Sequence, residues 1–218
     1  MTILPADLPD EARQAVLGGM RKRARTRGFW TPKLGHAHYE TLQLCAPHRV
    51  ALLPLSKMRN GSRHKTSAGK VPSDVARPSL STVAGILGWR FLIFEPDEMD
   101  KPIAAAHAVL TTEGDYRLGE LNEGPYVDST LTALQTPLVR EAISSKNDEG
   151  TFGEPLLLLA PAICFAGLWI RFQHAERDFI LPMDSNHLPG FVSVKPEELL
   201  ASLRCESTKV SSDSATAG

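Results

Sequence analysis

The sequence predicts an α+β fold in which a mainly antiparallel sheet of two hairpin groups carries a packed helix. Apolar runs broken by turn residues occur over 86–122 and again over 156–183, as antiparallel strands with short connections require. Residues 128–145, between the two groups, have helical character. An N-terminal helix and a disordered basic linker complete the predicted architecture.

An amphipathic helix is predicted over residues 8–26. Acidic residues stand near its start and basic residues near its end, as the helix dipole favours. Gly18 and Gly19 weaken its middle. Its apolar stripe has helical spacing and consists of Ala12, Val16, Leu17 and Met20.

Two short strands are predicted next, in "HYETLQLCA" and "RVALLPL". Proline cannot donate to a strand ladder, so Pro47 and Pro54 should confine these strands to edges or ends. Residues 1–55 are therefore interpreted as a helix with short strands, appended to a core domain over 83–204.

Residues 56–82 are rich in Ser, Gly, Pro, Lys and Arg and contain no aromatic residue. Such a composition buries too little apolar surface to offset its ordering entropy. The segment is predicted to be a basic, flexible linker or loop. Residues 205–218 are predicted to be a disordered tail for the same reason.

The region 86–122 predicts a three-stranded antiparallel meander, with Glu-Gly-Asp at 113–115 as one hairpin connection. The helix that follows is interrupted at Pro137. "LWIRF" and "FILPM", on either side of 175–178, predict a second hairpin. A short C-terminal helix is expected in "KPEELLASLR".

"PLLLLAPAICFAGLWIRF", residues 155–172, is the most apolar stretch of the chain. A membrane-spanning helix needs about 20 apolar residues, and this run also contains Pro161, so no membrane span is predicted. Both faces of a strand starting near Ala162 would be apolar, which predicts a central strand covered on both sides. Cys164 is expected to be buried, and the indole N–H of Trp169 to need a partner.

Sparse cysteines and the N-terminus predict a cytoplasmic location. The 218 residues include three cysteines and no C-x-x-C pair, which favours a reducing compartment. The first residues lack the basic and apolar regions of a secretory signal.

The charge is distributed unevenly along the chain. Residues 1–80 carry 14 Lys and Arg against 5 Asp and Glu, whereas the remainder carries 10 against 20. The densest basic run, "RKRARTRGFW", has aromatic residues at its end. Basic side chains can meet phosphates and aromatic rings can stack on bases, so this run is a candidate nucleic-acid site. The alternatives are that the basic and acidic halves neutralise each other in the fold, that these charges are merely solvated, or that they contact a membrane surface. The candidate residues are Arg21, Lys22, Arg23, Arg25, Arg27 and Trp30.

A metal site is a second candidate. On a strand, side chains two residues apart share a face, so His36, His38 and Glu40 would offer three ligands to zinc. The alternative is a pair of surface histidines in a flexible segment.

Motifs of known chemistry are absent from the sequence. It contains no G-x-S-x-G elbow, phosphate-binding loop, G-x-G-x-x-G or H-E-x-x-H. The leading hypothesis is thus a non-enzymatic, soluble binding or interaction protein with a protein partner and no cofactor. One alternative is a nucleic-acid-associated protein that uses the basic N-terminal region. The other is a metal-dependent hydrolase that uses His36, His38 and Glu40.

Overall fold

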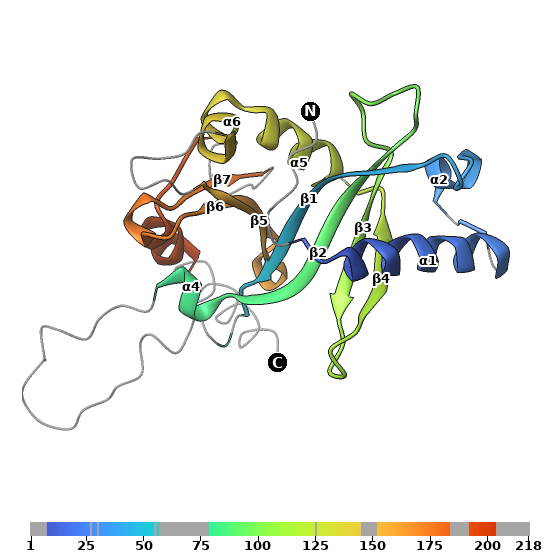
Figure 1. The fold of residues 1–218 in the computed structure, drawn as a ribbon. Helices are drawn as coiled ribbons and strands as arrows, with labels where there is room; N and C mark the ends of the chain where they lie inside the picture. Colours follow the sequence, from blue (N-terminus) through green and yellow to red (C-terminus); the bar gives the residue numbers. More distant parts are fainter. Residues whose placement is uncertain are drawn as a thin grey trace, which may run out of the picture.

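A single seven-stranded sheet in the order β4-β3-β2-β1-β5-β6-β7 organises the computed structural model (Figure 1). The structure describes residues 8–26, 28–29, 31–54, 56, 79–124, 126–144, 152–183 and 192–203. Neighbouring strands are antiparallel except for β1 and β5, which are parallel. The predicted α+β class with a mainly antiparallel sheet is confirmed.

The predicted meander is present as β2 (Gly85–Phe94), β3 (Ala104–Leu110) and β4 (Tyr116–Asn122). Its second connection is a tight turn in which the N–H of Thr111 donates to the carbonyl of Asp115 at 2.8 Å. Gly114 has φ +90° in this turn, a conformation that favours glycine. The Glu-Gly-Asp signal therefore identified the hairpin correctly.

The N-terminal region is part of this sheet, and its interpretation as an appendage is wrong. Instead of two short edge strands, the chain forms one central strand, β1 (Gln43–Leu52), between β2 and β5. Pro47 is accommodated in a bulge, where the pairing register with β2 shifts between Cys45 and His48. Pro54 follows the end of the strand.

Helix α1 (Asp10–Thr26) is predicted correctly, and the two glycines do not end it. It packs on β3 and β4 and buries Ala12, Val16 and Met20. A Cβ on Gly19 would lie 2.4 Å from the Cβ of Leu118 in β4. Glycine at position 19 thus allows the helix to approach the sheet closely.

The apolar run forms two strands rather than one. They are β5 (Glu154–Ala160) and β6 (Phe165–Arg171), joined by a short 3₁₀ helix (Pro161–Ile163) that begins at the proline. Cys164 ends the turn in a left-handed conformation and is exposed, so the expected burial of this cysteine is wrong. Strand β6 is buried on both faces, and β7 (Phe179–Pro182) completes the second predicted hairpin.

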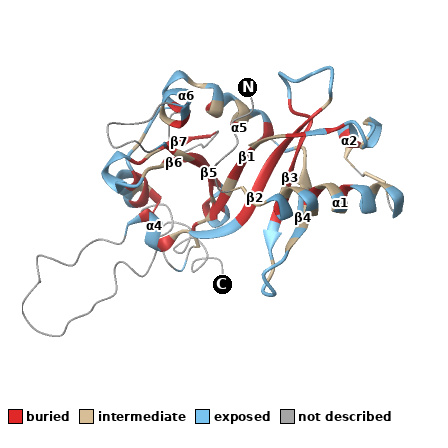
Figure 2. Ribbon diagram, viewed as in Figure 1, coloured by how far each residue is buried: buried red, intermediate tan, exposed pale blue. Residues whose placement is uncertain are grey.

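Helices cover both faces of the sheet. Helix α1 lies over one end of the first face, whereas α4 (Leu80–Val83) and the helix at 196–203 pack over its other end. Helices α5 (Tyr126–Gln135) and α6 (Pro137–Ser144) cover the opposite face (Figure 1). Buried residues follow the central strands, while the start of β2 and the β3–β4 turn are exposed (Figure 2).

A five-residue helix, α2 (Pro32–His36), precedes β1. Its free N–H groups at Lys33 and Leu34 donate to the carboxylate of Glu123 at 3.1 and 2.7 Å, which compensates for its shortness. Residues 57–78 and 204–218, which include most of the predicted linker and the predicted tail, lie outside the described residues. Within the described ranges, no helix is long and apolar enough to span a membrane.

Candidate functional site: a pocket beneath helices α5 and α6

A pocket of about 530 Å³ lies between the sheet and the α5–α6 pair. Strands β1, β2 and β5 supply its sheet side, and the two helices supply its opposite wall. The loop between β2 and β3 contributes Met99. The pocket is lined by Cys45, Ala46, Pro47, Phe94, Met99, Leu131, Leu134, Gln135, Arg140, Ile143 and Pro155.

The bulge in β1 shapes the sheet side of this pocket. Ala46 has φ +46°, an uncommon value for a residue with a Cβ. The carbonyl of Ala46 lies 2.7 Å from Nδ1 of His48, which donates to it and holds the bulge in place. Pairing between β1 and β5 begins only at Arg49, so the earlier part of β1 has no ladder partner on that side. The pocket occupies the sheet face at this irregular end.

Most of the described side chains in the lining are apolar. Among these described residues, Arg140 supplies the charge and Gln135 supplies the amide. Burial raises the pKa of the Cys45 thiol, although the positive charge of Arg13 opposes the shift. A raised pKa keeps this thiol protonated and therefore weakly nucleophilic at neutral pH. These groups suit binding rather than covalent chemistry.

A row of buried polar side chains lies on the same face of the sheet. His48, Arg90 and His107 occupy neighbouring positions on β1, β2 and β3. Arg90 is 1% exposed and His48 is fully buried. The Nη1 of Arg90 lies 3.5 Å from Oγ1 of Thr130 in α5. Within the described part of the chain, His48 Nε2, His107 Nε2 and Arg90 Nε have no hydrogen-bond partner.

Burial is the main cause of the pKa shifts of His48, Arg90 and His107. It lowers the pKa of His48 to about 3 and that of His107 to about 4, and the nearby charge of Arg90 adds to both shifts. Burial also lowers the pKa of Arg90 to about 10, opposed by Glu120. At neutral pH both imidazoles are therefore neutral and Arg90 is charged. Neither histidine has the pKa near 7 that suits an acid–base catalyst at that pH.

The predicted nucleic-acid residues divide between α1 and positions outside the described ranges. The described members of the set are all exposed on α1 and are Arg21, Lys22, Arg23 and Arg25. Arg27 and Trp30 lie outside the described residues.

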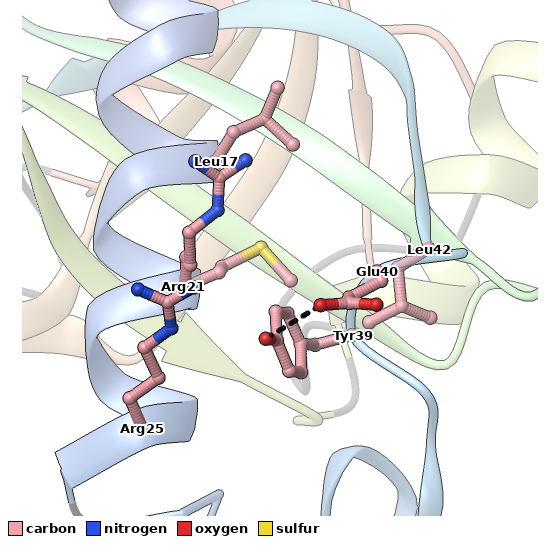
Figure 3. A pocket seen from close by; sticks show the side chains of 7 residues that line it. Leu17, Arg21, Arg25, Tyr39, Glu40 and Leu42 are labelled. Carbon is pink, nitrogen blue, oxygen red and sulfur yellow. Dashed lines mark hydrogen bonds between the residues drawn. The ribbon is translucent and has the colours of Figure 1, made fainter.

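Arg21 and Arg25 line a second pocket, of about 320 Å³, between α1 and the segment before β1 (Figure 3). Across from them, the hydroxyl of Tyr39 donates to Oε1 of Glu40 at 3.0 Å. The carboxylate of Glu40 therefore lies in the same pocket as two guanidinium groups.

The geometric basis of the predicted metal site is not met. His36 is the last residue of α2, and His38 and Glu40 lie in the turn that follows, so strand alternation does not apply to them. Across the described ranges, no three His, Cys, Asp or Glu side chains are grouped so that they could hold a metal ion. The strand was expected from His38 onward, whereas β1 begins only at Gln43.

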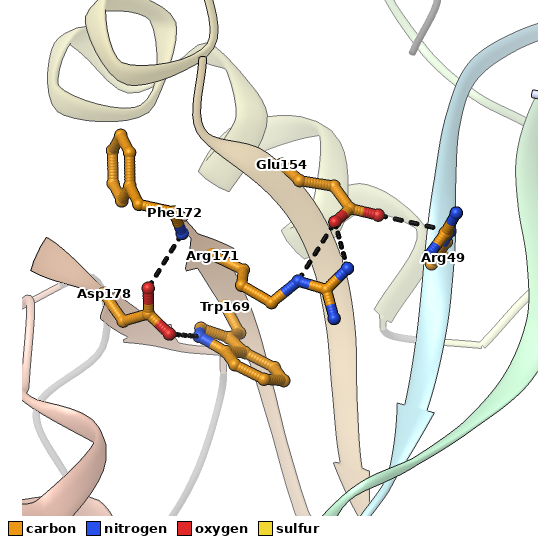
Figure 4. A network of polar contacts seen from close by, with 6 residues as sticks. All are labelled: Arg49, Glu154, Trp169, Arg171, Phe172 and Asp178. Carbon is orange, nitrogen blue, oxygen red and sulfur yellow. Dashed lines mark hydrogen bonds and ion pairs between the residues drawn. The ribbon is translucent and has the colours of Figure 1, made fainter. Parts of the chain in front are cut away.

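A polar network on the other face joins β1, β5, β6 and β7 (Figure 4). The Glu154 carboxylate pairs with Arg49 Nε at 3.2 Å and accepts hydrogen bonds from Arg171. Asp178 accepts from Trp169 Nε1 at 2.9 Å and from the N–H of Phe172 at 2.8 Å. Both oxygens of Asp178 thus accept hydrogen bonds, whereas Oε1 of Glu154 is held by its ion pair with Arg49 and accepts no hydrogen bond from the described residues. The network holds the strands together.

The pocket beneath α5 and α6 was not predicted from the sequence. Its lining comes from segments between residues 45 and 155 that are far apart in the chain. The local signal was the pair Ala46-Pro47 inside an otherwise strand-like run, because a proline in a central strand requires a bulge. No protein-family model, curated protein or solved structure matches this chain.

Proposed function

We propose that this protein is a non-enzymatic binding protein whose pocket beneath α5 and α6 holds a small, mainly apolar molecule. The observation that carries the proposal is the pocket itself. Its volume of about 530 Å³ and its apolar lining with few polar groups fit the usual properties of small-molecule sites. The protein partner and the cytoplasmic location expected from the sequence stay predictions.

The chemistry around the pocket supports binding over catalysis. The Cys45 thiol in the lining has its pKa raised by burial and so stays protonated. The nearest buried histidine, His48, is neutral and holds the Ala46 carbonyl. Each of these groups has a positioning or space-filling role that needs no reaction.

A neutral fluorescent probe, N-phenyl-1-naphthylamine, tests the proposal. We expect its fluorescence to rise and saturate when the protein is added, because the pocket removes the probe from water. The variant Leu134→Trp places a larger side chain in the pocket and should abolish this rise.

Leu138→Trp is the matched control, because Leu138 is 45% exposed on α6 and is not part of the lining. This variant should bind the probe as the wild type does. Saturable binding that is equal in wild type and in Leu134→Trp would place the probe elsewhere and reject the proposal.

Nucleic-acid association through α1 is a second candidate function. The observation that favours it is that the basic side chains in the last turns of α1 form no ion pair within the described residues. Although the Glu40 carboxylate shares a pocket with Arg21 and Arg25, basic side chains without an ion-pair partner on one helix are suited to phosphate contact. They are Arg21, Lys22, Arg23 and Arg25.

Fluorescence anisotropy of labelled single-stranded DNA and RNA tests this second candidate. Binding should weaken steeply with salt. Arg21→Gln/Arg25→Gln should reduce the slope of log K against log salt by about 0.7 for each phosphate that the helix no longer neutralises. The control Lys101→Gln/Arg117→Gln removes the same charge from other exposed positions. Equal effects of both double variants, or no binding at low salt, would exclude a specific role for α1.

A further inference from the structure

Arg140 is placed to recognise a charged group at the pocket. It is the charged residue of the lining and is itself exposed. No ion pair joins its guanidinium to a carboxylate within the described parts of the chain. Among the described residues, no Asp or Glu belongs to the lining. An arginine that has no carboxylate partner among these residues is available to a ligand anion.

Helix α6 holds Arg140 in a defined position. The N–H of Arg140 donates to the carbonyl of Thr136 at 2.9 Å at the start of the helix. Three residues later, Ile143 is buried against the sheet and anchors the same helix. Gln135, the last residue of α5, also lines the pocket. Arg140 and Gln135 thus both line the pocket from rigid elements near the α5–α6 junction.

A carboxylate matches these donors best. The planar fork of a guanidinium binds a carboxylate through two parallel hydrogen bonds, and an amide N–H can add a third. Arg90, buried on the same sheet face and charged at neutral pH, contributes potential of the same sign. Apart from the Cys45 thiol, the other side chains of the described lining are apolar, which suits a hydrocarbon chain or ring.

We propose that the pocket selects small amphipathic carboxylates, with Arg140 binding the carboxylate and the apolar lining enclosing the hydrocarbon part. This inference rests on the proposed function and adds the chemical class of the ligand. Arg140 acts here as the specificity-determining residue.

Displacement of N-phenyl-1-naphthylamine by three ten-carbon compounds tests the inference. Decanoate, decanol and decyltrimethylammonium share the chain and differ in the charge of the head group. On the wild type, we expect decanoate to displace the probe at the lowest concentration and the cation at the highest. Arg140→Gln should raise the decanoate concentration needed by about tenfold, in line with the removal of a charge-assisted hydrogen bond, and leave decanol unchanged.

Two further variants separate charge from shape. Arg140→Lys keeps the charge without the fork and should weaken decanoate less than Arg140→Gln does. Arg117→Gln, at an exposed position on β4, should have no effect.

The outcomes distinguish the inference from the function beneath it. If decanoate and decanol displace the probe equally from the wild type, or if Arg140→Gln weakens both equally, the carboxylate preference is wrong while the pocket still binds. If none of the three compounds displaces the probe, the inference about the ligand class is wrong, whereas the binding function is decided separately by the probe itself and by Leu134→Trp.

Discussion

His48 links the hydrophobic interior to the shape of the pocket. Its Nδ1 is 2.7 Å from the carbonyl of Ala46, which it holds in a left-handed bulge, and its ring is fully buried. The same burial lowers its pKa to about 3, so the folded protein disfavours protonation of this ring. The ionisation of this one side chain therefore affects both the stability of the fold and the bulge that shapes the sheet side of the pocket.

Acid should destabilise the protein through this histidine. In the unfolded chain His48 titrates near its usual pKa of about 6.5. Below that pH the unfolded state takes up a proton that the folded state refuses until about pH 3, so stability falls as pH is lowered through this window. Each such histidine contributes about 1.4 kcal/mol per pH unit.

Urea unfolding of wild type and His48→Gln between pH 7 and pH 5 measures this effect. The free energy of unfolding of the variant should depend less steeply on pH. Identical slopes in the two proteins would show that His48 is not a neutral buried imidazole.

Single residues were predicted unevenly from the sequence. Trp169 was expected to need a partner for its indole, and Asp178 supplies it. Cys164 was expected inside the core and is exposed, because the chain turns at Pro161 rather than continuing as a strand. Periodicity identifies which residues are apolar, but it does not show where a continuous apolar run reverses direction.

Helix α1 is joined to the sheet at a point where only a glycine fits. Gly18 and Gly19 are adjacent and both helical, but their surroundings differ. A Cβ at position 18 would meet nothing within 4 Å, whereas one at position 19 would meet Leu118 at 2.4 Å. An alanine at position 19 therefore tests the close contact with β4, and an alanine at position 18 is its control.

The two alanine variants should change stability in opposite directions. Gly18→Ala should stabilise the protein by about 0.5–1 kcal/mol, the usual gain from alanine over glycine in a helix. Gly19→Ala should destabilise it by about 1–3 kcal/mol, because the methyl group pushes α1 away from β4. Chemical denaturation checks both values. Stabilisation by both variants would mean that α1 does not pack on β4 at this position.

Strand β6 is the first strand of the second predicted hairpin and lies between β5 and β7 in the sheet. Leu168 is fully buried within it and is paired on both sides, with Leu157 and Leu181. Leu168→Asp should prevent folding, because a buried unpaired carboxylate has no compensating partner there. The control is Leu110→Asp, since Leu110 is 50% exposed at the end of β3. A folded Leu168→Asp with an unchanged melting temperature would contradict the strand assignment.

Elements with regular patterns were predicted well, and irregular ones were not. The meander and the helix with its break at Pro137 follow from local signals. Strand β1 was divided into two edge strands, because the rule that excludes proline from central strands does not anticipate a bulge. Its central position depends on β5, which begins about a hundred residues later in the chain.

At the scale of the whole molecule, the parallel pair β1–β5 unites the two antiparallel groups into one sheet. The pocket arises at the end of this pair where the ladder is incomplete. Its position thus depends on a contact between distant segments, and composition and spacing alone could not have predicted it. The metal and nucleic-acid candidates, in contrast, were predicted from residues that are close together in the sequence.

Methyl chemical shifts in the presence of N-phenyl-1-naphthylamine show whether the pocket beneath α5 and α6 binds a small apolar molecule. Protein labelled at Met, Leu and Ile methyl groups should show shifts at Met99, Leu131, Leu134 and Ile143. The methyl groups of Leu17, Met20 and Leu42, which line the other pocket, should stay unchanged. Shifts confined to the second set, or spread over exposed residues such as Ile86 and Leu87, would show that the pocket beneath α5 and α6 is not the binding site.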